Sequence, residues 1–329
     1  MTDATAPPAA DKKLKGAAGE STPGGPEREF TVESRSQSQM VIGRFLHHRL
    51  AMACLIVLTI VVLFSLIGGR LWTYSYQEIT NSFNTPPFRA LDENGDLVWS
   101  AQHPMGTDTE GHDFMALILR GAQKSVQIML LVAFLSTAIG IVYGAVSGYY
   151  RGRIDGVLMR ILDVLFTIPL LAILIVLSRR IEGSGSWLFV ALLLGFFVWF
   201  TLARLVRAEF LSLREKEFVE AARALGAGDA RIIFRHILPN IVGTIIVSAT
   251  LTMATAILLE TALSFLGLGI RAPDTSLGLL VARYQAASTT RPWLFYIPGV
   301  FVVIIALCVN FVGDGLRDAF DPKQQRVRQ

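Results

Sequence analysis

The sequence predicts an all-α membrane protein with about six transmembrane helices, because its composition is strongly apolar and long stretches carry no charge. Hydrophobic residues make up 52% of the 329 residues and charged residues only 17%, with a mean hydropathy of +0.50. In soluble domains, by comparison, about a quarter of the residues are charged. Five stretches of at least 20 residues hold no Asp, Glu, Lys or Arg: 50–69, 125–150, 183–203, 236–259 and 292–313. As helices they are long enough to cross a hydrocarbon core of about 30 Å, and their continuous apolar character excludes a β-barrel.

A sixth span is expected over about 157–178. This segment carries Arg160 and Asp163 near one end and Pro169 in the middle, but residues 164–178 are rich in Leu, Ile and Val. The first span begins some fifty residues into the chain without a small-residue cleavage site after it, so we interpret it as a retained helix rather than a signal peptide. Cys54 and Cys308 both fall within spans and show no metal-ligand spacing, so no metal site is expected and both are interpreted as packing residues.

Basic residues predict the orientation of the chain. With the N-terminus inside, 21 of the 30 Lys and Arg fall in segments assigned to the cytoplasm. This excess fits the positive-inside rule and places both termini in the cytoplasm. The net charge of +4 and the pI near 9.2 then reflect loops beside an anionic leaflet, and they do not indicate a nucleic-acid partner.

Composition also divides the chain into segments. Residues 1–40 are rich in Ala, Pro, Gly, Ser and charge and are expected to form a disordered cytoplasmic tail. The remaining segments are the first span with its basic entry at 41–69, an extracytoplasmic segment at 70–124, the membrane core at 125–316 and a cytoplasmic tail at 317–329. Asp163 and Glu260 are expected near the ends of their spans, where an ionised group can reach water, rather than at the midplane like a proton-relay carboxylate.

Small and polar residues recur at helical spacing within two spans. Gly140, Gly144 and Gly148 follow Ser136 at four-residue intervals and predict a ridge against which another helix packs closely. In the fifth span, a polar stripe is formed by Asn240, Thr244, Ser248 and Thr252 and continued by Thr255. The stripe is either a set of interhelical hydrogen bonds or the wall of a translocation path for a polar solute, and the sequence leaves both interpretations open.

The connection at 207–239 predicts a helical hairpin on the cytoplasmic face. Its first part has helix-forming composition, and Gly226 and Gly228 end that helix. Asp229 is the expected N-cap of a second short helix that ends before Pro239. A plain solvated loop is the alternative, but such a loop has no need of a tight glycine turn between two short helices with apolar faces.

This connection resembles the coupling loop of ATP-binding-cassette importer permeases. The family pattern is Glu-Ala-Ala, three residues, Gly, nine residues, Ile, one residue, Leu, Pro, and the matching positions here are Glu220, Ala221, Ala222, Gly226, Leu238 and Pro239. His236 stands where the pattern has Ile. Three further stretches resemble the C-subunit type of the dipeptide and oligopeptide branch: 103–113, 263–269 and 313–322.

Two places depart from that branch. Thr109, Glu110 and His112 interrupt its usual acidic-Leu-Gly-Arg-Asp run, and Leu277 stands where it often has Trp. Both places lie on the predicted external side of the membrane, so they bear on the substrate side and leave the coupling loop unchanged.

The resemblance implies a type I ABC importer permease of MetI-like fold in a bacterial cytoplasmic membrane. The implied partners are a homologous permease that completes a heterodimeric pore, two cytosolic ABC ATPases, an extracytoplasmic peptide-binding protein, and membrane lipid. The chain itself holds no Gly-x-x-x-x-Gly-Lys-Ser/Thr phosphate loop. The resemblance therefore implies a non-catalytic subunit that binds no cofactor, with ATP and Mg²⁺ bound by the ATPases and transport by alternating access.

Di- and oligopeptides are the expected solutes, with nickel chelates or glutathione-like peptides as alternatives within the same branch. An ion-coupled secondary transporter is the main alternative class. It would call for an ionisable residue at the midplane or broken helices in matched halves, and the sequence shows neither. A non-transporting scaffold would have no use for the predicted coupling hairpin.

Overall fold

The computed structural model describes residues 37–91, 96–180 and 185–320 of the chain. The predicted N-terminal tail lies outside the described residues up to residue 36, and the predicted C-terminal tail lies outside them from residue 321. The helices are α1 (Gln37–His47), α2 (Arg49–Leu71), α3 (Phe114–Tyr150), α4 (Gly152–Thr167), α5 (Leu170–Arg180), α6 (Trp187–Val198), α7 (Phe200–Leu213), α8 (Glu217–Ala224), α9 (Asp229–Arg231), α10 (Val242–Phe265), α11 (Leu277–Tyr284) and α12 (Pro292–Phe320).

Five helical segments within the described residues are long and apolar enough to cross a membrane, and a bent pair makes a sixth. The five are α2, α3, α6 with α7, α9 through α10, and α12, while the bent pair is α4 with α5, at 76°. The bend follows from the sequence, because Ile168 precedes Pro169 and adopts an extended backbone at φ −79° and ψ 126°. The prediction of an all-α protein with about six spans is confirmed.

Helix α3 is longer than the charge-free stretch that predicted it. It begins at Phe114 rather than at residue 125, because the carboxylate of Asp113 caps its first turn by accepting the Ala116 N–H at 2.8 Å. Arg120 and Lys124, which precede the charge-free stretch in the sequence, lie on this helix and both contact Asp274. Counting charge-free residues therefore underestimates a helix whose charged residues are paired within the fold.

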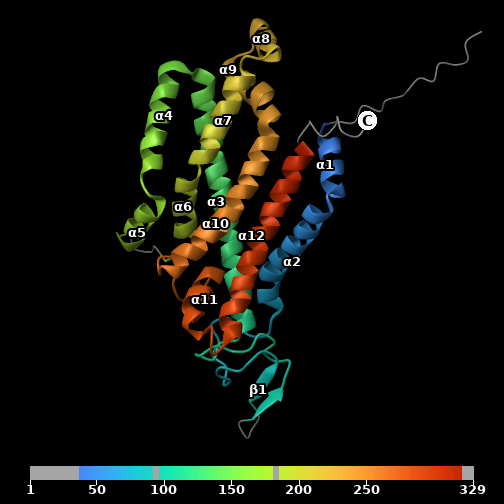
Figure 1. Cartoon of the computed structure of the whole chain (residues 1–329), viewed down its shortest axis with the longest axis vertical. Helices are drawn as coiled ribbons and strands as arrows, with labels where there is room; N and C mark the ends of the chain where they lie inside the picture. Colours follow the sequence, from blue (N-terminus) through green and yellow to red (C-terminus); the bar gives the residue numbers. More distant parts are fainter. Residues whose placement is uncertain (1–36, 92–95, 181–184, 321–329) are drawn as a thin grey trace, which may run out of the picture. The chain divides into compact units, whose positions relative to one another are not determined.

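Helix α3 lies in the middle of the bundle, where α6 and α7 pack on one side of it and α2 and α10 on the others (Figure 1). The glycine ridge faces α7. A Cβ added at Gly144 would lie 2.5 Å from the Ala203 carbonyl oxygen, and one added at Gly148 would lie 2.6 Å from the Phe210 Cβ. At Gly140 the nearest atoms belong to Leu202, at 3.0 Å. The close approach of α3 and α7 thus depends on these three positions carrying no side chain.

A two-stranded antiparallel sheet is the one departure from helix among the regular elements of the described residues. Strand β1 (Arg89–Leu91) pairs with β2 (Leu97–Trp99), with Ala90 opposite Val98. The hairpin belongs to the predicted extracytoplasmic segment 70–124. It lies at the end of the bundle opposite to α8 (Figure 1).

The second helix of the predicted hairpin does not end before Pro239, and that prediction is wrong. The chain continues from α9 through a π-helical turn, η1 (Ile232–Ile237), and a 3-10 turn, η2 (Leu238–Ile241), into α10. Proline removes one backbone donor and clashes with the carbonyl one turn earlier in a regular α-helix. The π and 3-10 turns change the local backbone pitch around Pro239, so the helical path continues into the span.

Candidate functional site

The hairpin around α8 is closed by the backbone turn that its glycine predicts. Gly226 has φ +82°, its N–H donates to the Arg223 carbonyl at 2.9 Å, and the Ala227 N–H donates to the Ala222 carbonyl at 3.0 Å. This pair of bonds is a Schellman motif with glycine at the left-handed position. A glycine at 226 therefore ends α8 and turns the chain back toward α9.

The two alanines of the Glu-Ala-Ala motif face opposite ways. Ala222 is 8% exposed and, like the fully buried Val219, faces the protein, whereas Ala221 and Glu220 are exposed. Ala222 therefore belongs to the inner face of α8, which packs on the π-helical turn, and Ala221 belongs to the outward surface. Leu225, 89% exposed at the end of α8, belongs to the outward surface and was not singled out from the sequence.

Hydrogen bonds fix the base of the hairpin to the bundle. Asp229 is not the N-cap of α9, which is Gly228 and has no side-chain bond. Its Oδ1 instead accepts the hydroxyl of Tyr149 at 2.7 Å, which ties the hairpin to the end of α3. Beside it, Arg207 on α7 donates two hydrogen bonds to Asp155 on α4, at 2.5 and 2.7 Å. These bonds tie the base of the hairpin to α3 and join α7 to α4 beside it.

Leu238 and Pro239 lie at the junction between the hairpin and α10. Leu238 is half-buried and packs on the cluster that holds Val219 and Ile237, while Pro239 is exposed in the 3-10 turn. The coupling motif therefore extends from an exposed helix to the start of a membrane span, and Val219 of α8 and Leu238 pack in one hydrophobic cluster.

The polar stripe, which runs from Asn240 in η2 onto α10, forms few bonds to other helices. The Thr252 hydroxyl donates to the Ser248 carbonyl at 2.9 Å, and the Asn240 amide donates to the His236 carbonyl at 2.6 Å. Thr244, whose Oγ1 lies 3.5 Å from the Glu209 carboxylate, makes the contact to a neighbouring helix. Since hydroxyls bonded to their own helix need no partner helix, interhelical bonding within this chain does not explain the stripe.

Glu260 lies near the end of α10, as predicted, but it is buried and does not reach water, so that part of the prediction is wrong. Its side chain is fully buried between α3, α10 and α11, where three serine hydroxyls donate to it. Ser125 lies at 3.2 Å, Ser264 at 2.8 Å and Ser276 at 2.6 Å. Asp163, by contrast, is exposed and pairs with Arg204 at 2.8 Å. The sequence held no signal for the burial of Glu260, because its serine partners lie up to 135 residues away.

The sequence motif 103–113 builds a buried junction where α2 and α3 meet. The carboxylate of Asp113 accepts the indole N–H of Trp72 at 2.9 Å, and its other oxygen lies 2.7 Å from His103 Nδ1. Both His103 and Asp113 are buried. The motif thus fastens the chain that leaves α2 to the start of α3.

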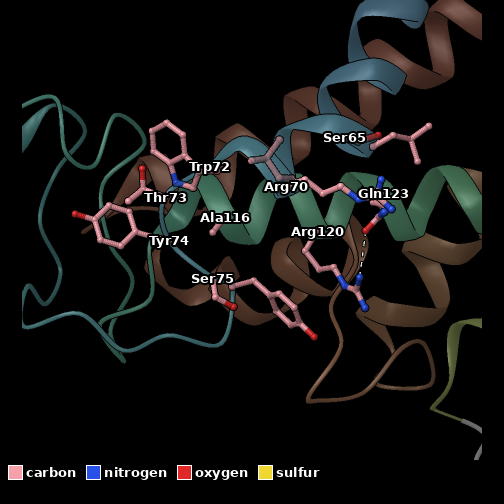
Figure 2. A pocket seen from close by; sticks show the side chains of 13 residues that line it. Ser65, Arg70, Trp72, Thr73, Tyr74, Ser75, Ala116, Arg120 and Gln123 are labelled. Atoms are coloured by element: carbon pink, nitrogen blue, oxygen red, sulfur yellow. Dashed lines mark hydrogen bonds between the residues drawn. The ribbon is translucent and has the colours of Figure 1, made fainter.

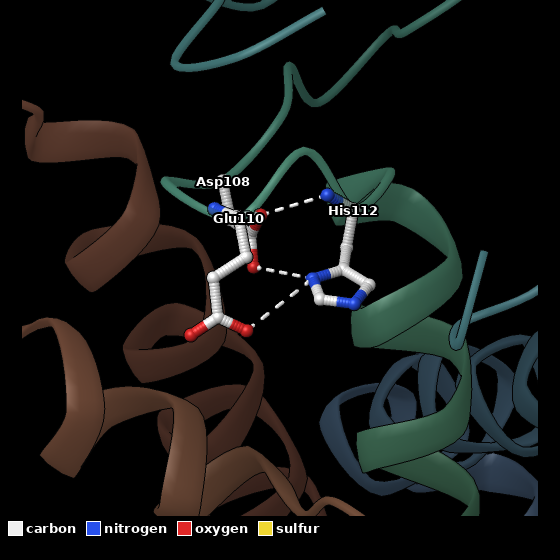
Figure 3. Close-up of side chains that lie close together, drawn as sticks. All are labelled: Asp108, Glu110 and His112. Carbon is white, nitrogen blue, oxygen red and sulfur yellow. Dashed lines mark hydrogen bonds and ion pairs between the residues drawn. The ribbon is translucent and has the colours of Figure 1, made fainter. Parts of the chain in front are cut away.

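Two residues that depart from the branch pattern take part in a second cluster, which Figure 3 shows as Asp108, Glu110 and His112. Their potential metal-binding atoms all lie within 4.8 Å of one another. However, Asp108 already accepts two backbone N–H groups and the Tyr284 hydroxyl, while Glu110 pairs with Arg283. Burial and the Asp108 carboxylate raise the pKa of Tyr284, so this hydroxyl stays a donor. The cluster links the chain before α3 to α11.

The comparison with protein families matches this architecture. The chain belongs to the family of binding-protein-dependent transport system inner membrane components, which its residues 140–326 match. Residues 36–87 match the N-terminal transmembrane domain of oligopeptide transport permease C. The family resemblance predicted from the coupling motif is confirmed, and the chain is a permease component rather than an enzyme.

Individual relatives cover nearly the whole chain. It is 40% identical over 299 residues to the oligopeptide transport system permease protein OppC of Mycobacterium tuberculosis, covering 91% of this chain and 99% of the relative. It is 36% identical over 297 residues to the OppC of Escherichia coli K12, covering 90% and 95%. The permease fold is also that of a solved chain of the MetNI methionine ABC transporter in an inward-facing conformation. That likeness has a TM-score of 0.53 at 21% identity and covers 63% of this chain and 98% of that one.

Proposed function

We propose that this chain forms one half of the translocation pathway of an ATP-binding-cassette importer for di- and oligopeptides. The proposed assembly contains a homologous permease, two cytosolic ATPases that bind ATP and Mg²⁺, an extracytoplasmic peptide-binding protein and surrounding membrane lipid. The names of the OppC relatives support the solute class. Nickel chelates and glutathione-like peptides are the alternatives within the same branch.

The hairpin around α8 is the observation that carries this proposal. An eight-residue helix with an exposed Glu220, Ala221 and Leu225 projects from the bundle, while its inner face and Asp229 join it to the membrane helices. A docked ATPase could bind the exposed face of such a helix, and its movement would displace the helix. The proposed orientation therefore places α8 and both termini in the cytoplasm and the β1–β2 hairpin outside, in agreement with the distribution of basic residues.

The stripe formed by Asn240, Thr244, Ser248 and Thr252 is proposed to line the pathway. Its side chains are exposed or half-buried and are bonded mainly to their own helix. Hydroxyl and amide groups along a single helix face offer a passing peptide exchangeable hydrogen bonds without a fixed charge.

Uptake into proteoliposomes tests the function. The complete importer should accumulate a labelled peptide when ATP and the binding protein are supplied, and an imposed proton gradient without ATP should have no effect. Uptake that follows the proton gradient would identify a secondary transporter instead. A strain lacking this chain should also lose growth on peptides as its amino-acid source; undiminished uptake of every peptide, with loss of another solute, would refute the solute class.

A further inference from the structure

A polar cavity of about 470 Å³ lies where α2 leaves the bundle (Figure 2). Its walls are the last two turns of α2, the connection 72–76 and the first turns of α3. The charged side chains among the described residues that line it are Arg70 and Arg120, and no acidic side chain is among them. The cavity therefore favours an anionic group.

The two arginines differ in the hydrogen bonds and ion pairs that they form with other residues. Arg120 donates to both carboxylate oxygens of Asp274, at 2.7 and 3.1 Å, and to Gln123 at 3.2 Å. Lys124 also contacts Asp274 at 3.3 Å, so two cations share this single carboxylate. Arg70 is exposed and has no hydrogen bond or ion pair with the rest of the described chain. Its planar guanidinium is thus free to form a bidentate contact with a phosphate or a carboxylate.

The surroundings of the cavity show which anion is suited to it. Leu66 lines the cavity, and Leu63, Ile67 and Leu71 continue from it along the outward face of α2, each at least 47% exposed. On the other side, Trp72, Tyr74 and Tyr76 follow the end of this span. Aromatic residues at the end of a span are typical of the headgroup level of a bilayer.

We propose that this cavity binds the phosphate of an anionic phospholipid, with Arg70 as its principal ligand and Arg120 beside it. The acyl chains would lie along the exposed apolar residues of α2. A free phosphate ion would use the same guanidinium groups but gain nothing from the apolar face. In the proposed orientation, the lipid belongs to the outer leaflet.

Lipid retention by the assembled importer tests this proposal independently of its solute. The complex is delipidated in detergent and titrated with dioleoyl phosphatidylglycerol, and bound lipid is counted by native mass spectrometry. Dioleoylglycerol, which has the same chains without phosphate, is the ligand control. Inorganic phosphate, added as a competitor, distinguishes a lipid site from a site for the free ion.

Two variants change the site in different ways. Arg70→Gln removes the charge and should weaken binding of one phosphatidylglycerol by about tenfold. Gly69→Leu keeps Arg70 but should fill the cavity and also reduce binding, since a Cβ at Gly69 has no atom within 4 Å and its helical backbone accepts a side chain. Arg291→Gln, a matched charge change outside the cavity, should bind like the unmodified protein.

The proposal predicts that phosphatidylglycerol binds to the unmodified complex and the Arg291 variant with equal affinity, that both cavity variants bind it more weakly, and that dioleoylglycerol does not bind there. Equal lipid retention in Arg70→Gln and the unmodified complex would overturn the proposal. Displacement of the lipid by millimolar inorganic phosphate would reassign the site to the free ion. The absence of any retained phosphatidylglycerol in the unmodified complex would likewise overturn the proposal.

Discussion

Replacement of Gly226 by Val tests the coupling hairpin at the position where its geometry is most demanding. Gly226 has φ +82°, and an added Cβ would have no atom within 4 Å. The substitution therefore introduces backbone strain without a clash, at a cost of about 1–2 kcal/mol for an L-residue in this region. If the strain is expressed fully in the turn, the docking-competent hairpin becomes about 5- to 30-fold less populated relative to other turns.

The nearby Gly228 supplies a matched control. It also has no atom within 4 Å of an added Cβ, but its backbone lies at φ −71° and ψ 161°, a region open to any residue. Gly228→Ala should therefore keep the turn, whereas Gly226→Val should weaken binding of the ATPases, by up to about 30-fold.

The assay is binding of the purified ATPases to the permease pair in nanodiscs, with peptide uptake measured in parallel. Size-exclusion profiles of the solubilised permease report whether each variant is folded. Unchanged ATPase affinity and uptake in Gly226→Val, or an equal loss in Gly228→Ala, would show that the left-handed turn does not position the docking helix.

Three further predictions concern the membrane helices. Cysteines at Thr244 and Ser248 should react with water-soluble thiol reagents in a nucleotide-dependent way if the stripe lines the pathway; inertness in every nucleotide state would assign the stripe to packing. Glu260→Leu should lower the thermal unfolding temperature more than Glu260→Gln, because it leaves three buried serine hydroxyls without their acceptor, at about 1–3 kcal/mol each; equal temperatures would contradict this. Gly148→Ala should destabilise the chain by about 1–3 kcal/mol through overpacking against Phe210, whereas Gly156→Ala, with open space around it, should not; matching unfolding temperatures would refute the tight contact.

The inward-facing position of Ala222 determines what mutations of the coupling motif can show. Because Ala222 packs inward, a bulky residue there would disturb the hairpin itself. Loss of transport in such a variant would report on packing rather than on contact with an ATPase. Substitutions at the exposed Ala221 or Leu225 probe the contact surface without that ambiguity.

The sequence alone determined the features that depend on neighbouring residues. Charge-free stretches fixed the membrane helices because an uncompensated charge in hydrocarbon is costly, and Pro169 marked the bend between α4 and α5. Gly226 marked the end of α8 because glycine adopts a left-handed backbone at little cost. The coupling motif could also be recognised from the sequence, because all of its residues lie within one short hairpin and keep a fixed spacing.

Only the tertiary structure decided the features that join distant segments. Arg120 and Lys124 lie within α3 because Asp274, some 150 residues later, supplies their counter-charge. Glu260 is buried because serines from three elements converge on it, and Ala222 turns inward because the π-helical turn before Pro239 packs beneath α8. The burial of a side chain and its pairing depend on which segments come into contact in the folded chain. The spacing of neighbouring residues in the sequence does not specify those contacts.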